Sequence, residues 1–101
     1  QHNLKLLDGL KALAREAGMN PAQLSLAWTL KQGRDVVSIP GTTRLDHLAE
    51  NAVAADLTIS DDVAKRLEEL FSRSSVRGTR YAPAGQATVD TEEYDAPVSA
   101  R

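Results

Sequence analysis

The chain has no cysteine among its 101 residues and no apolar run that approaches the length of a membrane span. Without cysteine it has neither a disulfide framework nor a thiolate metal site, and this composition is compatible with the cytoplasm, where we expect the protein. A bilayer-spanning helix needs about 20 consecutive apolar residues, and residues 1–10 lack the basic and then apolar order of a signal peptide. The composition therefore argues against a disulfide-stabilised scaffold and against a membrane partner.

The chain also lacks a strong excess of charge of either sign, since its formal net charge is −2 at pH 7. This balance does not suggest a nucleic-acid-binding protein or a polybasic membrane anchor. Arg73, Arg77 and Arg80 are interleaved with serine and glycine, a pattern more typical of a solvated arm than of a nucleic-acid interface. With 42% hydrophobic and 26% charged residues, the composition is that of an ordinary soluble domain.

Common catalytic motifs are missing from the sequence: it has no P-loop, no Gly-x-Gly-x-x-Gly, no His-Glu-x-x-His and no nucleophile elbow. The adjacent Asp61 and Asp62 could be considered as metal ligands, but no second cluster of ligands lies near them in the sequence. Both follow Ser60 at an expected helix start, where the helix dipole favours acidic side chains. The sequence therefore predicts no metal site.

The richest chemical pattern lies in residues 36–51. Val36, Val37 and Ile39 are β-branched and apolar, which predicts a short strand buried on both faces. Pro40 would end this strand because proline has no N–H to donate to a neighbouring strand. A buried strand needs partners for its backbone groups, and the rest of this sequence contains no second convincing strand.

A Pro-Gly-Thr-Thr turn at residues 40–43 leads into a helix. We expect Thr43 to cap this helix, with Asp46 as a weaker stand-in for the Glu or Gln of a capping box. The free N–H groups of the first turn and the positive end of the helix dipole would favour a phosphate there. The segment therefore suggests an anion-binding or nucleotide-binding site.

The helix after this turn has two different faces. Spacings of three and four residues predict an inward apolar face made of Leu45, Leu48, Ala52 and Ala55. Arg44, His47 and Asn51 share an adjacent polar face, with Glu50 beside them. Arg44 offers a charged fork for a phosphate, and Glu50 with Asn51 offers acceptors and donors suited to the edge of a purine base. The same pattern is also compatible with the solvated side of an ordinary surface helix.

Helices are predicted before and after this stretch. Residues 4–17 carry apolar side chains at helical spacing, and Gly18 would close that helix. Asn20, Pro21 and Gln23 form the pattern of a capping box with proline at the first helical position. The buried stripe of this second helix is predicted to be Leu24, Ala27, Trp28 and Leu30, with the helix ending at Gly33.

A last helix begins after Ser60, and its predicted apolar stripe is Val63, Leu67, Leu70 and Phe71. Trp28 lies on the same stripe as leucines, so we expect it in the core rather than as a platform for a ligand. Helical periodicity is lost from Ser72 onward. Residues 91–101 are acidic and polar with little to bury, and we expect them to be disordered.

Residues 39–44, Ile-Pro-Gly-Thr-Thr-Arg, followed by Leu-Ala-Glu-Asn at residues 48–51, resemble the end of the aldo-keto reductase barrel. In that family the last strand and last helix bind the adenosine 2′-phosphate end of NADP. The resemblance implies that Thr42, Thr43 and Arg44 lie near the 2′-phosphate and ribose. It also implies that Glu50 and Asn51 approach the adenine amino group.

Two further positions belong to the cofactor site that the resemblance implies. Many family members carry a lysine right after the proline and an arginine further along the helix, where this chain has Gly41 and His47. Arg44 could supply the charge that these replacements remove. We therefore expect NADP as the cofactor in preference to NAD.

Two other segments resemble the same family. Residues 13–18 and 20–28 are similar to the helical pair that precedes the last strand, and residues 77–81 are similar to the C-terminal arm. The implied fold class is α/β: the chain would be a C-terminal fragment of a (β/α)₈ TIM barrel, mostly helical with one short strand. Residues 1–90 would form this barrel portion and residues 91–101 a disordered tail. A complete barrel needs about 250 residues.

The resemblance implies an NAD(P)H-dependent reductase that converts a small carbonyl substrate to an alcohol by hydride transfer. In the family, an aspartate, a tyrosine, a lysine and a histidine perform this step, and all four would lie in a missing upstream barrel portion. His2, His47, Tyr81 and Tyr94 show no spacing that would rebuild such a site. We therefore predict no catalytic residue in this chain, and no activity of the chain alone.

A second hypothesis is a standalone helical module, derived from a truncated reductase, that binds another protein through its apolar faces. The sequence favours the reductase hypothesis over this module. Cofactor-binding chemistry is present at Thr42, Thr43, Arg44, Glu50 and Asn51, and a pure scaffold has no physical need for it.

Overall fold

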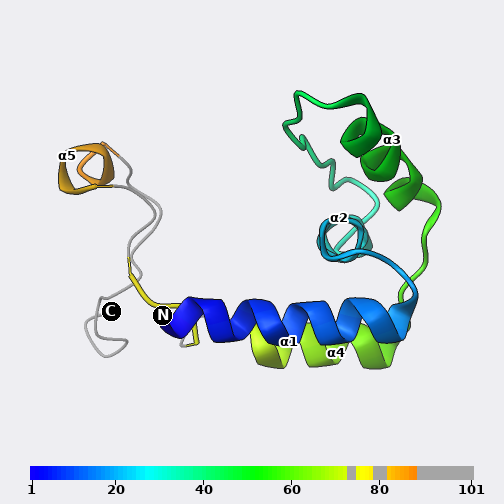
Figure 1. The fold of residues 1–101 in the computed structure, drawn as a ribbon, viewed down its shortest axis with the longest axis horizontal. Coiled ribbons are helices and arrows are strands. Elements are labelled where there is room, and N and C mark those ends of the chain that lie inside the picture. The colour runs from blue at the N-terminus through cyan, green and yellow to red at the C-terminus, as the bar shows by residue number, and fades with distance from the viewer. Residues whose placement is uncertain (73–74, 79–81, 89–101) are drawn as a thin grey trace.

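The computed structural model describes residues 1–72, 75–78 and 82–88, which form helices joined by loops (Figure 1). The elements are α1 (His2–Ala17), α2 (Pro21–Lys31), α3 (Leu45–Val53), the 3-10 turn η1 (Ala54–Asp56), α4 (Asp61–Leu70) and the short α5 (Pro83–Gln86). α1 and α4 lie side by side, α2 packs on α1, and α3 lies beyond α2 (Figure 1). Within the described ranges, no helix is long and apolar enough to cross a membrane.

The predicted stop of α1 and the predicted start of α2 are confirmed. Gly18 closes α1 in the left-handed region, with φ of 72°. Asn20 and Gln23 form both hydrogen bonds of the capping box, and Pro21 occupies the first position of α2. α1 begins at His2, two residues before the predicted start, and α2 ends at Lys31 rather than at Gly33.

The cap of α4 is also confirmed, because Ser60 Oγ accepts a hydrogen bond from the backbone N–H of Val63 at 3.2 Å. Asp61 and Asp62 lie in the first turn of this helix, as predicted. Asp61 forms an ion pair with Lys31 of α2 at 2.9 Å. That ion pair joins α4 to the end of α2.

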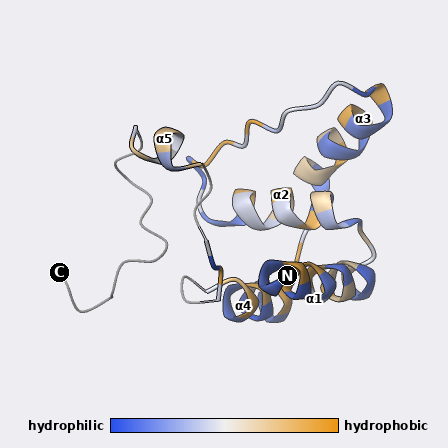
Figure 2. Cartoon of the chain, turned by 60° about the vertical axis from the view of Figure 1, so that its left-hand side comes forward, coloured by the Kyte–Doolittle hydropathy of each residue, from blue (hydrophilic) through white to orange (hydrophobic). Residues whose placement is uncertain are grey.

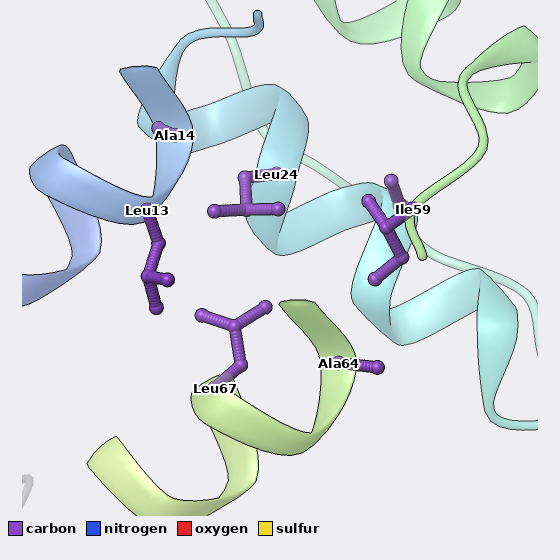
Figure 3. Close-up of a cluster of buried hydrophobic side chains, with 7 residues drawn as sticks. Leu13, Ala14, Leu24, Ile59, Ala64 and Leu67 are labelled. Atoms are coloured by element: carbon purple, nitrogen blue, oxygen red, sulfur yellow. The ribbon is translucent and has the colours of Figure 1, made fainter. Parts of the chain in front are cut away.

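The core lies where α1, α2 and α4 meet. Its buried residues are Leu13, Ala14, Leu24, Ala27, Ile59, Ala64 and Leu67. Figure 3 shows Leu13, Leu24 and Leu67 pointing toward one another from three different helices. Leu24 is fully buried, and such burial contributes about 1.5–3 kcal/mol for a leucine side chain.

The predicted stripes of α2 and α4 enter this core only in part. Trp28 is half-buried and packs against the core, in agreement with the prediction that it is a core residue. Leu30 is also half-buried. Phe71, at the end of α4, remains 40% exposed.

The predicted strand at Val36, Val37 and Ile39 is wrong, because the structure describes residues 36–44 as a loop without strand. Val37 and Ile39 are 80% and 94% exposed instead of buried. A strand is stabilised by hydrogen bonds to neighbouring strands. The residues that the structure describes include no strand that could be such a neighbour. The β-branched side chains alone do not create the strand.

The predicted cap of α3 is also wrong. Arg44, not Thr43, is the N-cap residue, and it makes no side-chain cap. Thr42 Oγ1 accepts a hydrogen bond from the Arg44 N–H at 3.2 Å, while Asp46 binds the Arg44 guanidinium instead of supporting a capping box.

The inward apolar face predicted for α3 does not pack inward. Leu45 and Leu48 are 85% and 52% exposed, and Ala52 and Ala55 are exposed as well. Such a face would pack against a sheet, and the described part of the chain contains no sheet. Figure 2 shows hydrophobic colour along the loop that leads to α3 and on α3 itself.

Polar contacts tie the two ends of α1 to other parts of the chain. Near its C-terminal end, Glu16 binds Arg66 of α4 through two hydrogen bonds of 2.6 and 3.1 Å. At its start, the Asn3 side chain exchanges two hydrogen bonds with the backbone of Arg77, of 2.7 and 3.0 Å. His2 Nε2 lies 2.7 Å from the carbonyl oxygen of Ser75.

Several predictions fall on residues outside the described ranges. They concern Arg73, Arg80, Tyr81, Tyr94 and the tail at residues 91–101. The division of the chain at residue 90 also stays a prediction.

Candidate functional site

A groove of about 740 Å³ separates the start of α2 from α3 and the loop before it. One side is lined by Asn20, Pro21, Ala22, Ser25 and Leu26, and the other by Pro40, Gly41, Thr42, His47, Glu50 and Asn51. The volume is within the range of about 300–1,000 Å³ that is typical of small-molecule sites. The groove therefore brings most of the predicted site residues to one surface.

Helical spacing explains the α3 side of the groove. His47, Glu50 and Asn51 are three and four residues apart, so they project from one face of the helix. Glu50 is exposed and Asn51 is half-buried. A carboxylate, an amide and an imidazole thus line the groove within one helical turn.

The loop side of the groove is open at Gly41. A Cβ atom placed on Gly41 would meet no atom within 4 Å, so the structure itself does not require glycine at this position. Thr42 lines the groove beside it, and its hydroxyl is engaged with the backbone of Arg44. The hydroxyl oxygen can accept a further hydrogen bond from a ligand.

The α2 side of the groove was not predicted from the sequence. It comes from the capped start of α2, where Asn20 and Gln23 hold the first turn in place. Gln23 Nε2 also donates a hydrogen bond of 3.1 Å to the backbone carbonyl of Glu50. This contact joins the two walls although the residues are 27 positions apart.

Arg44 and Thr43 do not line the groove. The Arg44 guanidinium forms a two-point contact with the Asp46 carboxylate, with Nε–Oδ1 and Nη2–Oδ2 distances of 3.0 and 2.7 Å. These hydrogen bonds hold the pKa of the Asp46 carboxyl below its ordinary value of 3.8. Arg44 would therefore have to share or leave Asp46 in order to bind a phosphate.

The groove offers donors and acceptors to a polar ligand rather than ligands to a metal. Among the residues that the structure describes, no group of three or more His, Asp and Glu side chains could hold a metal ion. Glu50 supplies an acceptor, and Asn51 supplies both an acceptor and donors. This combination matches a heterocycle with an exocyclic amino group.

A second, smaller cavity of about 320 Å³ is mainly apolar and borders α2 as well, with Ser25 lining both this cavity and the groove. It is lined by Leu10, Ser25, Trp28, Thr29, Leu67 and Phe71. Leu45 is 85% exposed and does not line this cavity. Thr42, His47, Glu50 and Asn51 line the larger groove and not this cavity.

Comparison with known proteins shows where the chain has relatives. Residues 1–71 match the sequence model described as the Aldo/keto reductase family. The chain is 38% identical over 87 residues to aldo-keto reductase yakc [NADP(+)] of Schizosaccharomyces pombe, which is 86% of this chain and 26% of that protein. No solved structure matches the chain.

Two further relatives give the same picture. The chain is 38% identical over 79 residues to probable aldo-keto reductase 1 of Glycine max, covering 78% of this chain and 23% of that protein. It is 33% identical over 92 residues to aldo-keto reductase str7 of Strobilurus tenacellus, covering 88% of this chain and 27% of that protein. The chain thus spans about a quarter of the length of the curated relatives it matches.

Proposed function

The chain belongs to the aldo/keto reductase family, and we propose that it supplies the part of an NAD(P)H-dependent carbonyl reductase that binds the adenosine end of the cofactor. The observation that carries this proposal is the groove in which Gly41, Thr42, His47, Glu50 and Asn51 come together. When bound, a nicotinamide cofactor supplies the hydride for carbonyl reduction. The residues of this chain would bind and orient its distant end.

The chemistry of the groove fits an adenosine group. We propose that the Glu50 carboxylate accepts a hydrogen bond from the adenine amino group, and that the Asn51 amide pairs with the base edge. Thr42 is the candidate for the ribose, and His47 borders the same surface. The apolar wall formed by Ala22 and Leu26 would cover the faces of the base.

NADP is the proposed cofactor in preference to NAD. Arg44 can bind the 2′-phosphate that only NADP carries, with Thr43 beside it. The name of the Schizosaccharomyces pombe relative includes NADP(+). Because the Arg44 guanidinium already forms an ion pair with Asp46, we expect a moderate preference for NADP over NAD.

Binding of the cofactor end does not amount to catalysis. We propose that the chain alone does not oxidise NADPH in the presence of aldehydes, because hydride transfer needs a positioned acid. A steady-state assay with a broad aldehyde panel tests this expectation. Turnover well above a buffer control, in material free of host reductases, would contradict it.

Binding can be tested on the chain itself with adenosine 2′,5′-bisphosphate, which carries the polar groups of the NADP adenosine end. We expect backbone amide NMR signals of residues 41–51, of Asn20 and of residues 22–26 to shift together during a titration. Glu50→Gln should weaken binding, whereas Glu69→Gln should not, because Glu69 is exposed on α4 and does not line the groove. Shifts scattered over α1 and α4, or an equal effect of both substitutions, would refute the proposal.

The second candidate, a helical protein-interaction module, is favoured by a different observation. Val37, Ile39 and Leu45 are 80%, 94% and 85% exposed, which is unusual for large apolar side chains so close together in sequence. A module of this kind would bind another chain through these residues and would not bind adenosine 2′,5′-bisphosphate. The titration described above therefore separates the two candidates.

A further inference from the structure

We propose that Gln23 is a positioning residue that holds Glu50 and Asn51 in place on the far wall of the groove. The inference rests on the proposed function for its ligand, but the contact itself can be tested without one. Gln23 does not line the groove, so its effect on a ligand would pass through the α3 backbone.

Both ends of the Gln23 side-chain amide are occupied. Its Oε1 accepts a hydrogen bond of 3.2 Å from the backbone N–H of Asn20, and its Nε2 donates one of 3.1 Å to the backbone carbonyl of Glu50. The orientation of the amide follows from this chemistry, because a backbone N–H requires an acceptor and a carbonyl requires a donor. The capping box thus aims the NH₂ group at α3.

The Glu50 carbonyl has a particular need for this donor. α3 ends at Val53, so Glu50 carries one of the last four carbonyls of the helix, which lack the usual helical partners. The N–H of Ala54, which would serve Glu50 in a continued α-helix, is directed at the carbonyls of Asn51 and Ala52 instead. The Gln23 side chain therefore completes the end of α3 while it caps the start of α2.

Gln23→Glu separates these two roles. A glutamate still accepts the Asn20 N–H and is the usual partner in a capping box, and its negative charge is favourable in a first helical turn. It has no NH₂ group, so the hydrogen bond to the Glu50 carbonyl is lost. We expect the urea unfolding midpoint to be maintained while the α3 backbone moves.

Two measurements follow from this substitution. Without ligand, the amide NMR signal of Asn51, whose peptide group contains the Glu50 carbonyl, should shift in Gln23→Glu. In a titration with adenosine, affinity should fall about twofold to tenfold, which is the scale of one hydrogen bond. Adenosine is uncharged, so this loss does not arise from repulsion by the new carboxylate.

Gln32→Glu is the matched control, because Gln32 also donates its side-chain amide to a backbone carbonyl, that of Trp28 at 2.9 Å, but outside the groove. This variant should leave the Asn51 signal and adenosine affinity unchanged.

An Asn51 signal that does not move in ligand-free Gln23→Glu would overturn the inference. So would unchanged adenosine affinity, or a loss confined to adenosine 2′,5′-bisphosphate. Failure of the parent chain to bind either ligand would refute the proposed function, and the ligand-free shift would still decide whether Gln23 holds α3.

Discussion

Replacement of Arg44 by alanine should weaken binding of adenosine 2′,5′-bisphosphate by about 1.5–3 kcal/mol, the scale of a hydrogen bond to a charged group. This corresponds to a loss of roughly 10-fold to 150-fold. Binding of adenosine 5′-monophosphate should change much less. The reason is that only the bisphosphate carries the 2′-phosphate that Arg44 is proposed to contact.

The structure places the expected loss near the lower end of this range. Arg44 already forms two hydrogen bonds with Asp46, and both side chains are more than half exposed, at 64% and 56%. A phosphate must compete with this carboxylate for the guanidinium. Asp46→Asn should therefore strengthen binding of the bisphosphate, since it removes the competing charge.

Isothermal titration calorimetry or NMR titration measures the affinity of each variant for both nucleotides. Arg34→Ala is the matched control, because it removes the same charge from an exposed residue that does not line the groove. The reasoning would be refuted by equal losses for the two nucleotides in Arg44→Ala. An equal loss in Arg34→Ala would also refute it, because the effect would then come from net charge alone.

Three further predictions concern the fold. Leu24→Ala should lower the free energy of unfolding by about 2–5 kcal/mol, because Leu24 is fully buried. Leu45→Ala should change it by about 0.5 kcal/mol or less, because that side chain is 85% exposed. Urea unfolding followed by circular dichroism compares the two variants. Arg66 holds the pKa of Glu16 below its ordinary value of 4.5, chiefly by hydrogen bonding, so this pair stabilises the fold above that value and the contribution is lost as the pH falls through the lowered pKa. Glu16→Gln should therefore lower the urea midpoint at about pH 6, and its difference from the parent should shrink as the pH falls below 4.5. The exposed apolar residues of the loop and α3 should make the chain self-associate, and Ile39→Lys should reduce this self-association in sedimentation experiments. A monodisperse parent monomer would contradict the expectation.

Three helix ends, the stop of α1 and the starts of α2 and α4, could be predicted from the sequence because their determinants are local. Asn20 and Gln23 lie three residues apart and bond to each other's backbone, and Ser60 bonds to a backbone N–H within the same turn. Gly18 adopts the left-handed conformation that a helix stop requires. No distant part of the chain is needed for these contacts.

The strand and the inward face of α3 could not be predicted reliably because both depend on partners. Val37 and Ile39 have the residue types of a buried strand, yet they are exposed where no neighbouring strand is described. The apolar spacing of Leu45 and Leu48 is that of a packed face, yet it meets no sheet. Periodicity reports what a segment can pack against, not whether the partner is present.

The candidate site was partly predictable for the same reason. Glu50 and Asn51 follow from spacing on one helix, but the opposite wall depends on the Gln23 contact across 27 positions. The engagement of Arg44 by Asp46 was missed, although the two residues are only two positions apart. The sequence analysis predicted that Arg44 binds a phosphate and did not take into account that the Asp46 carboxylate competes for its guanidinium.

The most direct test of the proposed adenosine site is to locate the base by NMR. In a complex of the chain with adenosine 2′,5′-bisphosphate, nuclear Overhauser contacts from the adenine H2 and H8 protons should reach the side chains of Asn51, Leu26 and Ala22, which line the groove. Contacts to Trp28 and Phe71 in the smaller cavity, or no contacts under conditions where binding is saturated, would contradict the account.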